Sequence, residues 1–283
     1  MDPGLETRPA TLDDVPAIRA LLAAHGNDGP VTTVDIVGPY LRHCVDHGRA
    51  FVTVDASGLV GYGATVDAGA ATHLADLFVR PDRLGTGIGR PLLDTVFGDA
   101  TRRTTFASDD PRALPLYVRA GMAPLWPSLY LEGDPASLPA QPASITSEPA
   151  DASRLSALEG AWVGHPREHD HAYWVSLPAA DTFVVTETGE PVAIGHARAR
   201  QVGAARTVDR LLVRPGADPV APVLAGLRRA SRGGPVHLVV QGPSPLLPIL
   251  LERGFRIVDR DTFMASDPAL IDPARLIANG GLL

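Results

Sequence analysis

Three glycines at alternating positions, Gly85, Gly87 and Gly89, are the residues whose types and spacing first suggest chemistry. They separate an apolar segment typical of a strand, residues 73–79, from a segment typical of a helix, residues 88–97. Amides at a helix N-terminus lack intrahelical partners, and glycine lets a ligand approach the backbone closely. The pattern therefore predicts a cradle for a pyrophosphate group.

The glycine stretch differs from the two best-known nucleotide-binding loops. It lacks the Lys-Ser/Thr ending of a P-loop, and its glycines are spaced by two throughout, unlike the dinucleotide fingerprint. From the stretch alone, an ordinary glycine-containing turn is the alternative.

The wider sequence, "LFVRPDRLGTGIGRPLL" (77–93) followed by "DDPRALPLYVRAGM" (109–122), favours the cradle. It resembles the GNAT superfamily of acyl-CoA-dependent N-acetyltransferases, and the resemblance covers most of residues 5–133. Members carry V-x-P at a strand end, then (Q/R)-x-x-G-x-(G/A), and later (N)-x-x-A-x-x-L-Y-x-x-x-G-(F/M). Gly87 and Gly89 fill the two small positions. The later pattern is filled by Ala113, Leu116, Tyr117, Gly121 and Met122.

Two positions depart from the pattern of the superfamily. Leu84 stands at the Gln/Arg position, although Arg83 is adjacent, and this weakens the expected phosphate contact. Asp110 stands at the Asn position before the last helix. Its carboxylate still suits a helix cap, but it is less favourable than an amide near an anionic cofactor.

The resemblance implies acetyl-CoA as cosubstrate and direct attack by an amine, without an acyl-enzyme. The pyrophosphate would lie on the amides of residues 85–90. The pantetheine arm would lie along residues 77–79, where a backbone N–H polarises the thioester carbonyl. The implied cofactor-binding residues are Leu77, Phe78, Val79, Leu84, Gly85, Thr86, Gly87, Ile88, Gly89, Arg90, Asp110 and Tyr117.

Two catalytic residues are expected, Tyr117 and Asp76. The resemblance implies that Tyr117 protonates the departing CoA thiolate; the alternative is a tyrosine that only packs on the last helix. Asp76 and His73 are the nearest candidates for the base, because they lie on the strand before the glycines. Strand alternation predicts that they face opposite ways. A structural role for either residue, with a water relay as the base, is the alternative.

A repeat covers the whole sequence of 283 residues. Four pairs of segments match in order at separations of 133 to 140, and the pairs are 9–18 with 149–158, 59–64 with 193–198, 76–81 with 210–215, and 116–122 with 249–255. We therefore expect two GNAT-like domains of mixed α/β class. Each would have a mostly antiparallel twisted sheet flanked by helices. The predicted bounds are 1–135 and 149–283, with a Pro- and Ala-rich linker at 136–148.

The second copy has lost the residues of the cradle. At a separation of 134, the three glycines correspond to Pro219, Ala221 and Val223, and Tyr117 corresponds to Leu250 or Leu251. Proline has no N–H to offer to a phosphate. We therefore predict that only the first copy binds acetyl-CoA.

A histidine-rich stretch in the second copy leaves three alternatives open. His165, His169 and His171 with Asp170 have spacings that suit a metal, but a wall of the acceptor site or a solvated helix start is also consistent. We predict no metal. The C-terminal residues 270–283 are apolar and are expected to pack as a tail.

Composition limits the partners and the location. The net charge of −7 argues against nucleic acid or an anionic membrane as the main partner. The chain has no lysine and one cysteine, Cys44, so a catalytic lysine and an internal disulfide are excluded. No apolar run approaches the ~18 residues of a membrane span. No secretory signal is evident at the N-terminus, and we expect a cytoplasmic protein.

The sequence thus predicts an N-acetyltransferase acting on a primary amine of a small molecule or peptide. The alternatives are a non-catalytic acyl-CoA sensor and, more remotely, a scaffold that binds no CoA. Members of the superfamily are often dimers, so the resemblance also allows a homodimer.

Overall fold

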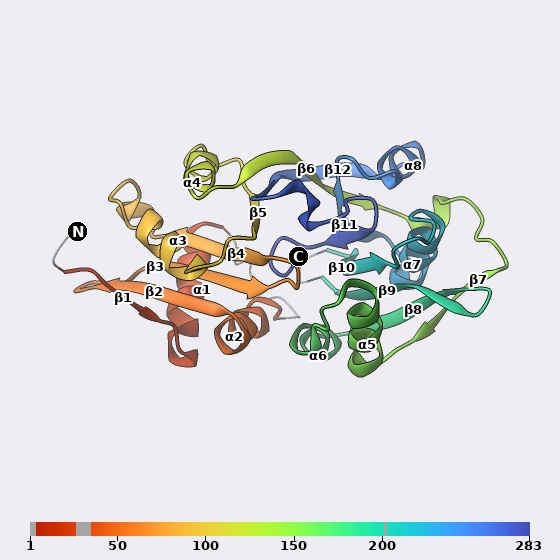
Figure 1. Ribbon diagram of the computed structural model, residues 1–283, viewed down its shortest axis with the longest axis horizontal. Coiled ribbons are helices and arrows are strands. Elements are labelled where there is room, and N and C mark those ends of the chain that lie inside the picture. Colours follow the sequence, from red (N-terminus) through yellow and green to blue (C-terminus); the bar gives the residue numbers. More distant parts are fainter. Residues whose placement is uncertain (1–3, 27–34, 201–202) are drawn as a thin grey trace.

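The computed structural model describes residues 4–26, 35–200 and 203–283. Within these residues, one continuous sheet of 13 strands runs through the molecule, and helices cover it (Figure 1). The first half contains β1 (Glu6–Pro9), α1 (Val15–Ala24), α2 (Val37–His47), β2 (Arg49–Asp55), β3 (Gly58–Asp67), β4 (Thr72–Val79), α3 (Gly89–Phe97), β5 (Arg103–Ala107), α4 (Ala113–Arg119) and β6 (Ala123–Gly133).

The second half repeats this order of strands and helices. It contains β7 (Ile145–Pro149), α5 (Ala152–Val163), α6 (Glu168–Ser176), β8 (Asp181–Glu187), β9 (Glu190–Ala199), β10 (Arg206–Val213), α7 (Ala221–Ser231), β11 (Val236–Gln241), α8 (Leu246–Glu252) and β12 (Arg256–Ala265). One further strand, β13 (Leu276–Ala278), follows. The predicted repeat and the predicted mixed α/β class are confirmed.

The two halves exchange strands at the middle of the sheet. β12 pairs with both β5 and β6, and β6 pairs with β11, so the local strand order is β5-β12-β6-β11. Figure 1 shows β12 and β6 side by side between the two halves. Each half therefore completes its sheet with the last long strand of the other half, an arrangement that the repeat itself did not predict.

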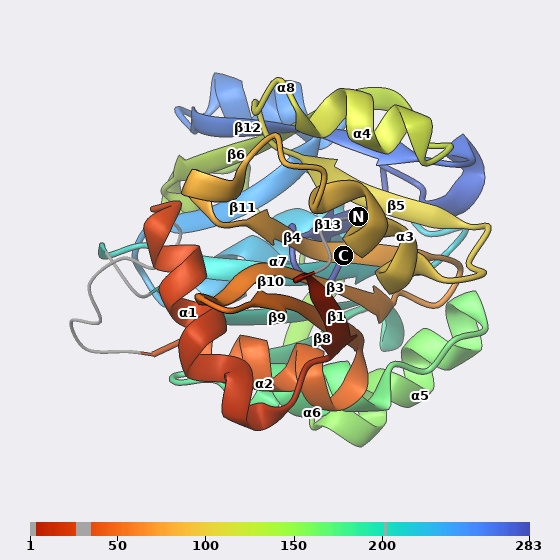
Figure 2. The ribbon, with the colours of Figure 1, turned by 90° about the vertical axis from the view of Figure 1, so that its left-hand side faces the viewer.

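The first half places helices on both faces of β3 and β4 (Figure 2). α1 begins after a capping box formed by Thr11 and Asp14, and it buries Val15, Ile18 and Leu22 against the sheet. Each such side chain contributes about 1.5–3 kcal/mol when fully buried. α3 packs on the opposite face. The end of β4 and the glycine stretch that follows it are thus held between two packed layers.

A β-bulge in β4 changes which side chains share a face. Ala64 pairs with Asp76 but Thr65 pairs with Leu74, so Ala75 is the extra residue. The alternation reverses across this residue. His73 and Asp76 therefore lie on the same face, and the prediction that they face opposite ways is wrong. A bulge cannot be found from strand periodicity, because it inserts one residue into an otherwise regular pattern.

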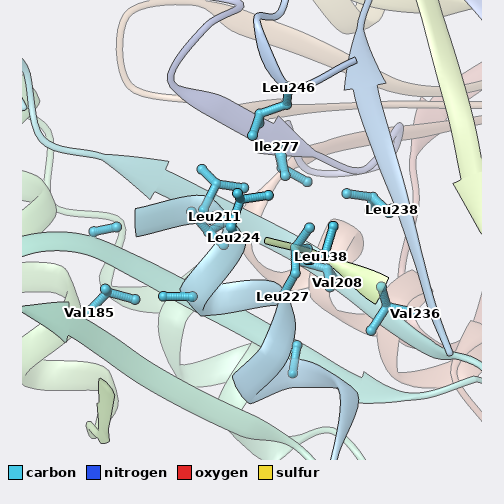
Figure 3. Packing of buried hydrophobic residues seen from close by; sticks show 14 of the residues in the cluster. Leu138, Val185, Val208, Leu211, Leu224, Leu227, Val236, Leu238, Leu246 and Ile277 are labelled. Carbon is cyan, nitrogen blue, oxygen red and sulfur yellow. The ribbon is translucent and has the colours of Figure 1, made fainter. Parts of the chain in front are cut away.

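β13 fills the space where β10 and β11 separate. The corresponding space in the first half, between β4 and β5, holds no strand among the described residues. β10 and β11 pair only at Arg206 and Thr207, and β13 then pairs with β10 from Arg210 to Leu212. Figure 3 shows Ile277 of β13 among the labelled residues of the buried cluster that packs around α7, near Leu211 and Leu246. The C-terminal segment is therefore part of the sheet and core, more than the packed tail that we expected.

The segment between the repeats is only partly a linker. Leu138 is buried in the core of the second half, and strand β7 begins at Ile145, inside the predicted linker 136–148. In the described residues, none of the helices has the length and apolar character needed to cross a membrane.

Candidate active site

A cavity of about 390 Å³ opens where β4 and β5 separate. The two strands pair in parallel only from Thr72 to Leu74, so the edge of β4 beyond Leu74 has no strand partner on this side among the described residues. The cavity is lined by His25, Leu77, Phe78, Val79, Arg83, Leu84, Gly85, Gly87, Ile88, Gly89, Ser108, Asp110, Arg112, Ala113, Leu116 and Tyr117. Ten of the predicted cofactor-binding residues thus line one cavity.

The glycine stretch presents free backbone amides to this cavity. Gly85 and Gly87 have φ of +78° and +87°, a left-handed conformation that other residues adopt rarely. In the described structure, the amides of Gly85, Gly87 and Ile88 donate no hydrogen bond. Alternating conformations of this kind form an anion-binding concavity, and the N-terminus of α3 follows directly. The geometry suits a phosphate or pyrophosphate.

Two predicted cofactor residues do not line the cavity. The Thr86 hydroxyl donates to the carbonyl oxygen of Arg83 at 2.6 Å, and the Arg90 side chain forms an ion pair with Asp94 at 2.9 Å. At Thr86 the amide also donates to the carbonyl oxygen of Arg83, so both of its polar donors are engaged within the loop. The sequence pattern could not separate side-chain from backbone roles, because it records only spacing.

Two charged pairs flank the cavity. Arg83 binds Asp55 through Nη2, while its buried Nε has no hydrogen-bond partner among the described residues. Asp110 is paired with Arg112 at 2.6 Å, and hydrogen bonds from Arg112 lower the pKa of Asp110. The negative charge of Asp110 is therefore offset by Arg112, and Arg83, the cation next to Leu84 in the sequence, is itself paired with Asp55.

Tyr117 is buried on α4 at the wall of this cavity. Burial raises the pKa of its hydroxyl, and the negative charges of Asp76, Asp110 and Asp261 raise it further. The phenol therefore stays protonated throughout the physiological range. A buried, protonated hydroxyl is suited to donate a proton.

A second cavity of about 430 Å³ adjoins the first, and Phe78 lines both. Both halves of the chain contribute to it. It is lined by Leu22, Ile36, Val37, Tyr40, Ala75, Asp76, Phe78, Phe106, Tyr130, Tyr173, Arg198, Asp209, Asp261 and residues 279–282. β4 thus separates two cavities, one beside the glycine loop and one between the halves.

Asp76 lines the second cavity and forms no ion pair with any of the described residues. Burial raises the pKa of Asp76 to about 6, and the neighbouring Tyr40 hydroxyl offsets this in part. Its Oδ2 is buried and has no hydrogen-bond partner among the described residues. A carboxylate with a pKa near neutrality and a free oxygen has the properties of a general base.

His73 is fully engaged by its neighbours. Its Nε2 lies 2.9 Å from the carbonyl oxygen of Gly280, and its Nδ1 lies 3.0 Å from the Thr104 hydroxyl. Burial lowers the pKa of His73 to about 4, so the ring is neutral. Because a carbonyl only accepts, Nε2 donates and Nδ1 accepts from Thr104. Neither nitrogen is free for a substrate, and His73 instead anchors the C-terminal segment.

Several lining residues carried no signal in the sequence. His25 follows α1 and its Nε2 lies 2.9 Å from the carbonyl oxygen of Val79, a contact made by helix packing alone. Asp261 and Asn279 reach the second cavity only because β12 and the C-terminal segment cross into the first half. No motif or spacing in either copy could have indicated them.

The histidine-rich stretch divides among separate environments. His171 binds Glu159 and His196, both at 2.9 Å, inside the second half, whereas the His169 ring stacks on His47 with centroids 4.2 Å apart. No metal-binding group of three or more His, Cys, Asp or Glu is present in the described residues. Of this region, only Tyr173 lines the second cavity.

The corresponding loop of the second half offers carbonyls in place of amides. Nη1 of Arg275 donates to the carbonyl oxygens of Arg214 and Ala217, at 2.9 and 2.7 Å. Leu250, at a position that corresponds to Tyr117, is fully buried. With β13 beside β10, this cleft lacks the free strand edge that β4 has beyond Leu74.

Comparisons with known proteins agree with this geometry. Residues 40–133, about a third of the chain, match the family model of the acetyltransferase (GNAT) domain. No curated protein matches the chain.

Solved structures resemble the whole chain. A putative acetyltransferase from Pyrococcus horikoshii superposes with a TM-score of 0.75 at 14% identity, covering 99% of this chain and 96% of that one. A tandem GNAT protein from the clavulanic acid biosynthesis pathway gives a TM-score of 0.63 at 16% identity, covering 93% and 99%. At such identities the likeness concerns the fold, which is that of tandem GNAT proteins.

Proposed function

We propose that this chain, with a GNAT domain match in its first half and a tandem GNAT fold, is an acetyltransferase. It moves the acetyl group of acetyl-CoA to a primary amine in the first half, while the second half completes the acceptor site. The observation that carries the proposal is the pair of cavities that meet at Phe78, with the amide cradle in one and Asp76 in the other. The family match supports acyl transfer in general.

The residues around the first cavity fit the parts of acetyl-CoA. The amides of Gly85 and Gly87, with Arg83 beside them, would hold the pyrophosphate. The unpaired edge of β4 beyond Leu74 offers backbone donors and acceptors to the amide groups of the pantetheine arm. The cosubstrate would supply the acetyl group as a thioester, whose carbonyl a backbone N–H of this edge would polarise.

The second cavity would bring the amine to the opposite side of β4. Asp76 would take the proton that the ammonium group must lose before it attacks. Tyr117, which stays protonated, would donate a proton to the leaving thiolate. The two roles suit their environments. Burial raises the pKa of Asp76 to about 6, where the carboxylate can accept a proton, and it raises the pKa of Tyr117, so that the phenol stays protonated.

Calorimetric titration with acetyl-CoA tests the proposal, with Gly87→Asp and Gly216→Asp measured beside the unchanged protein. Both glycines have φ of +87° and open space at the side-chain position. The two substitutions should therefore strain the backbone to the same extent. Gly87 lies in the cradle and Gly216 in the corresponding loop of the second half.

We expect one site per chain, weakened at least about tenfold by Gly87→Asp and unchanged by Gly216→Asp. Release of CoA that requires an added amine would then establish transfer. Tight binding without transfer to a broad amine panel would favour a non-catalytic sensor, and a second site lost in Gly216→Asp would contradict our reading of the second half.

A further inference from the structure

Only one of the carboxylates that line the second cavity forms an ion pair among the described residues. Three carboxylates line it, and Arg198 pairs with Asp209 at 3.0 Å. Asp76 and Asp261 have no ion-pair partner among the described residues. Asp261 accepts one hydrogen bond, from the Tyr130 hydroxyl at 2.6 Å, and burial raises its pKa. Two partly buried carboxylates that form no ion pair among the described residues would favour a positively charged group of a ligand in this cavity.

The strand order sets the separation of these two carboxylates. β5 lies between β4 and β12, with Leu74 opposite Thr105 and Ala107 opposite Thr262. Asp76 and Asp261 are therefore at similar heights on β4 and β12. Because β4 and β5 separate beyond Leu74, the distance between β4 and β12 at this height exceeds two regular strand spacings, about 10 Å. An ammonium group sits about 3 Å from a carboxylate oxygen. With one ammonium group at each carboxylate, the two nitrogens would be at least about 4 Å apart, which requires a linker of two or more carbons.

The rest of the wall suits a short aliphatic chain. Tyr40, Phe106 and Tyr173 contribute aromatic surface from α2, β5 and α6. Aromatic faces pack against methylene groups and attract cations. The cavity thus combines aromatic surface with two carboxylates that form no ion pair among the described residues.

We propose that the acceptor is a short aliphatic diamine, a substrate class that rests on the transfer function proposed above. The nitrogen to be acetylated lies at Asp76, and the second, protonated nitrogen binds Asp261. Asp261 is thus a specificity-determining residue, and it comes from the second half. The exchange of β12 into the first half is what places it there.

The test compares 1,4-diaminobutane with 1-aminobutane, which has the same carbon chain and one charge fewer. The kcat/KM for each amine is measured with acetyl-CoA for the unchanged protein, Asp261→Asn and Asp259→Asn. Asp259 is exposed on the same strand and serves as the matched control. Circular dichroism of each variant verifies the fold.

We expect the diamine to be preferred at least about tenfold, since a charge-assisted hydrogen bond is worth about that much. In Asp261→Asn the ratio between the two amines should fall at least about fivefold, and in Asp259→Asn it should not change. Equal kcat/KM for the two amines, or an equal loss for both in Asp261→Asn, would overturn the inference while leaving the transfer function intact.

Direct titration of both amines into the CoA-saturated protein separates the two proposals. If the diamine binds in an Asp261-dependent manner but no amine is acetylated, acceptor recognition stands and the transfer function fails. If neither amine binds nor reacts, both proposals are wrong.

Discussion

At the scale of single residues, Asp76 shows how the fold raises the pKa of a carboxyl group. The bulge at Ala75 turns it into the second cavity, and its burial without a cation raises its pKa to about 6. The base is ionised above this pH and protonated below it. We therefore expect activity to rise as the pH increases through about 6.

Replacement of Asp76 by Asn should lower kcat at least about 100-fold, a typical contribution of a general base. The rising limb of the pH profile near 6 should also disappear. A profile that keeps this limb in Asp76→Asn would assign the titration to another group. The pH dependence of kcat/KM for both proteins is the measurement.

The same substitution should stabilise the protein. The folded-state pKa lies above the ordinary value of 3.8, so the folded state binds the proton more tightly than the unfolded state. Stability from this residue is present at pH below 3.8 and is lost as the pH rises through about 6. Asp76→Asn should thus recover on the order of 2 kcal/mol at pH 7.5. Thermal unfolding at pH 3.5 and 7.5 measures the difference, which should vanish at the lower pH.

Tyr117 is predicted to act as an acid through its hydroxyl, while its ring lines the cavity proposed for the cofactor. Tyr117→Phe should lower kcat by about 10- to 100-fold and leave the Kd for acetyl-CoA within about twofold. A loss of acetyl-CoA affinity with unchanged kcat would instead make Tyr117 a packing residue. Calorimetry and steady-state kinetics together decide between the two.

At the scale of elements, the C-terminal segment has two roles. β13 fills the cleft of the second half, and the residues after it form a wall of the second cavity. Asn279 holds the turn between them, because its Oδ1 accepts from the amides of Gly281 and Leu282 and its Nδ2 donates to Asp209. The segment therefore links the cleft of the second half to the proposed acceptor site.

We expect Asn279→Ala to raise KM for the amine several-fold, roughly the effect of losing about 1 kcal/mol of hydrogen bonding. The Kd for acetyl-CoA should not change, since the first cavity does not include this segment. Parallel loss of both affinities would show that the substitution disturbs the fold more widely.

At the scale of the whole molecule, the exchanged strands make each half dependent on the other. β12 stands between β5 and β6, so removal of the second half would leave β5 and both edges of β6 unpaired. The bounds 1–135 and 149–283 remain predictions about the sequence, and they do not separate the sheet into two.

Residues 1–140 alone should therefore lack a cooperative unfolding transition. Residues 141–283 should behave likewise, because β11 would lose its partner β6. Produced together, the two fragments should assemble and bind one acetyl-CoA per pair. A fragment 1–140 that unfolds cooperatively by calorimetry would contradict the interdependence of the halves.

The sequence by itself determined what depends on local pattern. The repeat and the position of the glycine stretch between a strand and a helix were predictable, because periodicity and glycine conformation act over a few residues. For the same reason it indicated that Pro219 and its neighbours have lost the cradle.

Only the tertiary structure decided what depends on contacts distant in sequence. The bulge that brings Asp76 and His73 to one face, the exchange of β6 and β12, and the delivery of Asp261 and Asn279 to the first half left no local signal. These features follow from pairing and burial between segments more than a hundred residues apart, or from one extra residue in a strand. Local patterns fix which elements form, but packing decides which side chains meet.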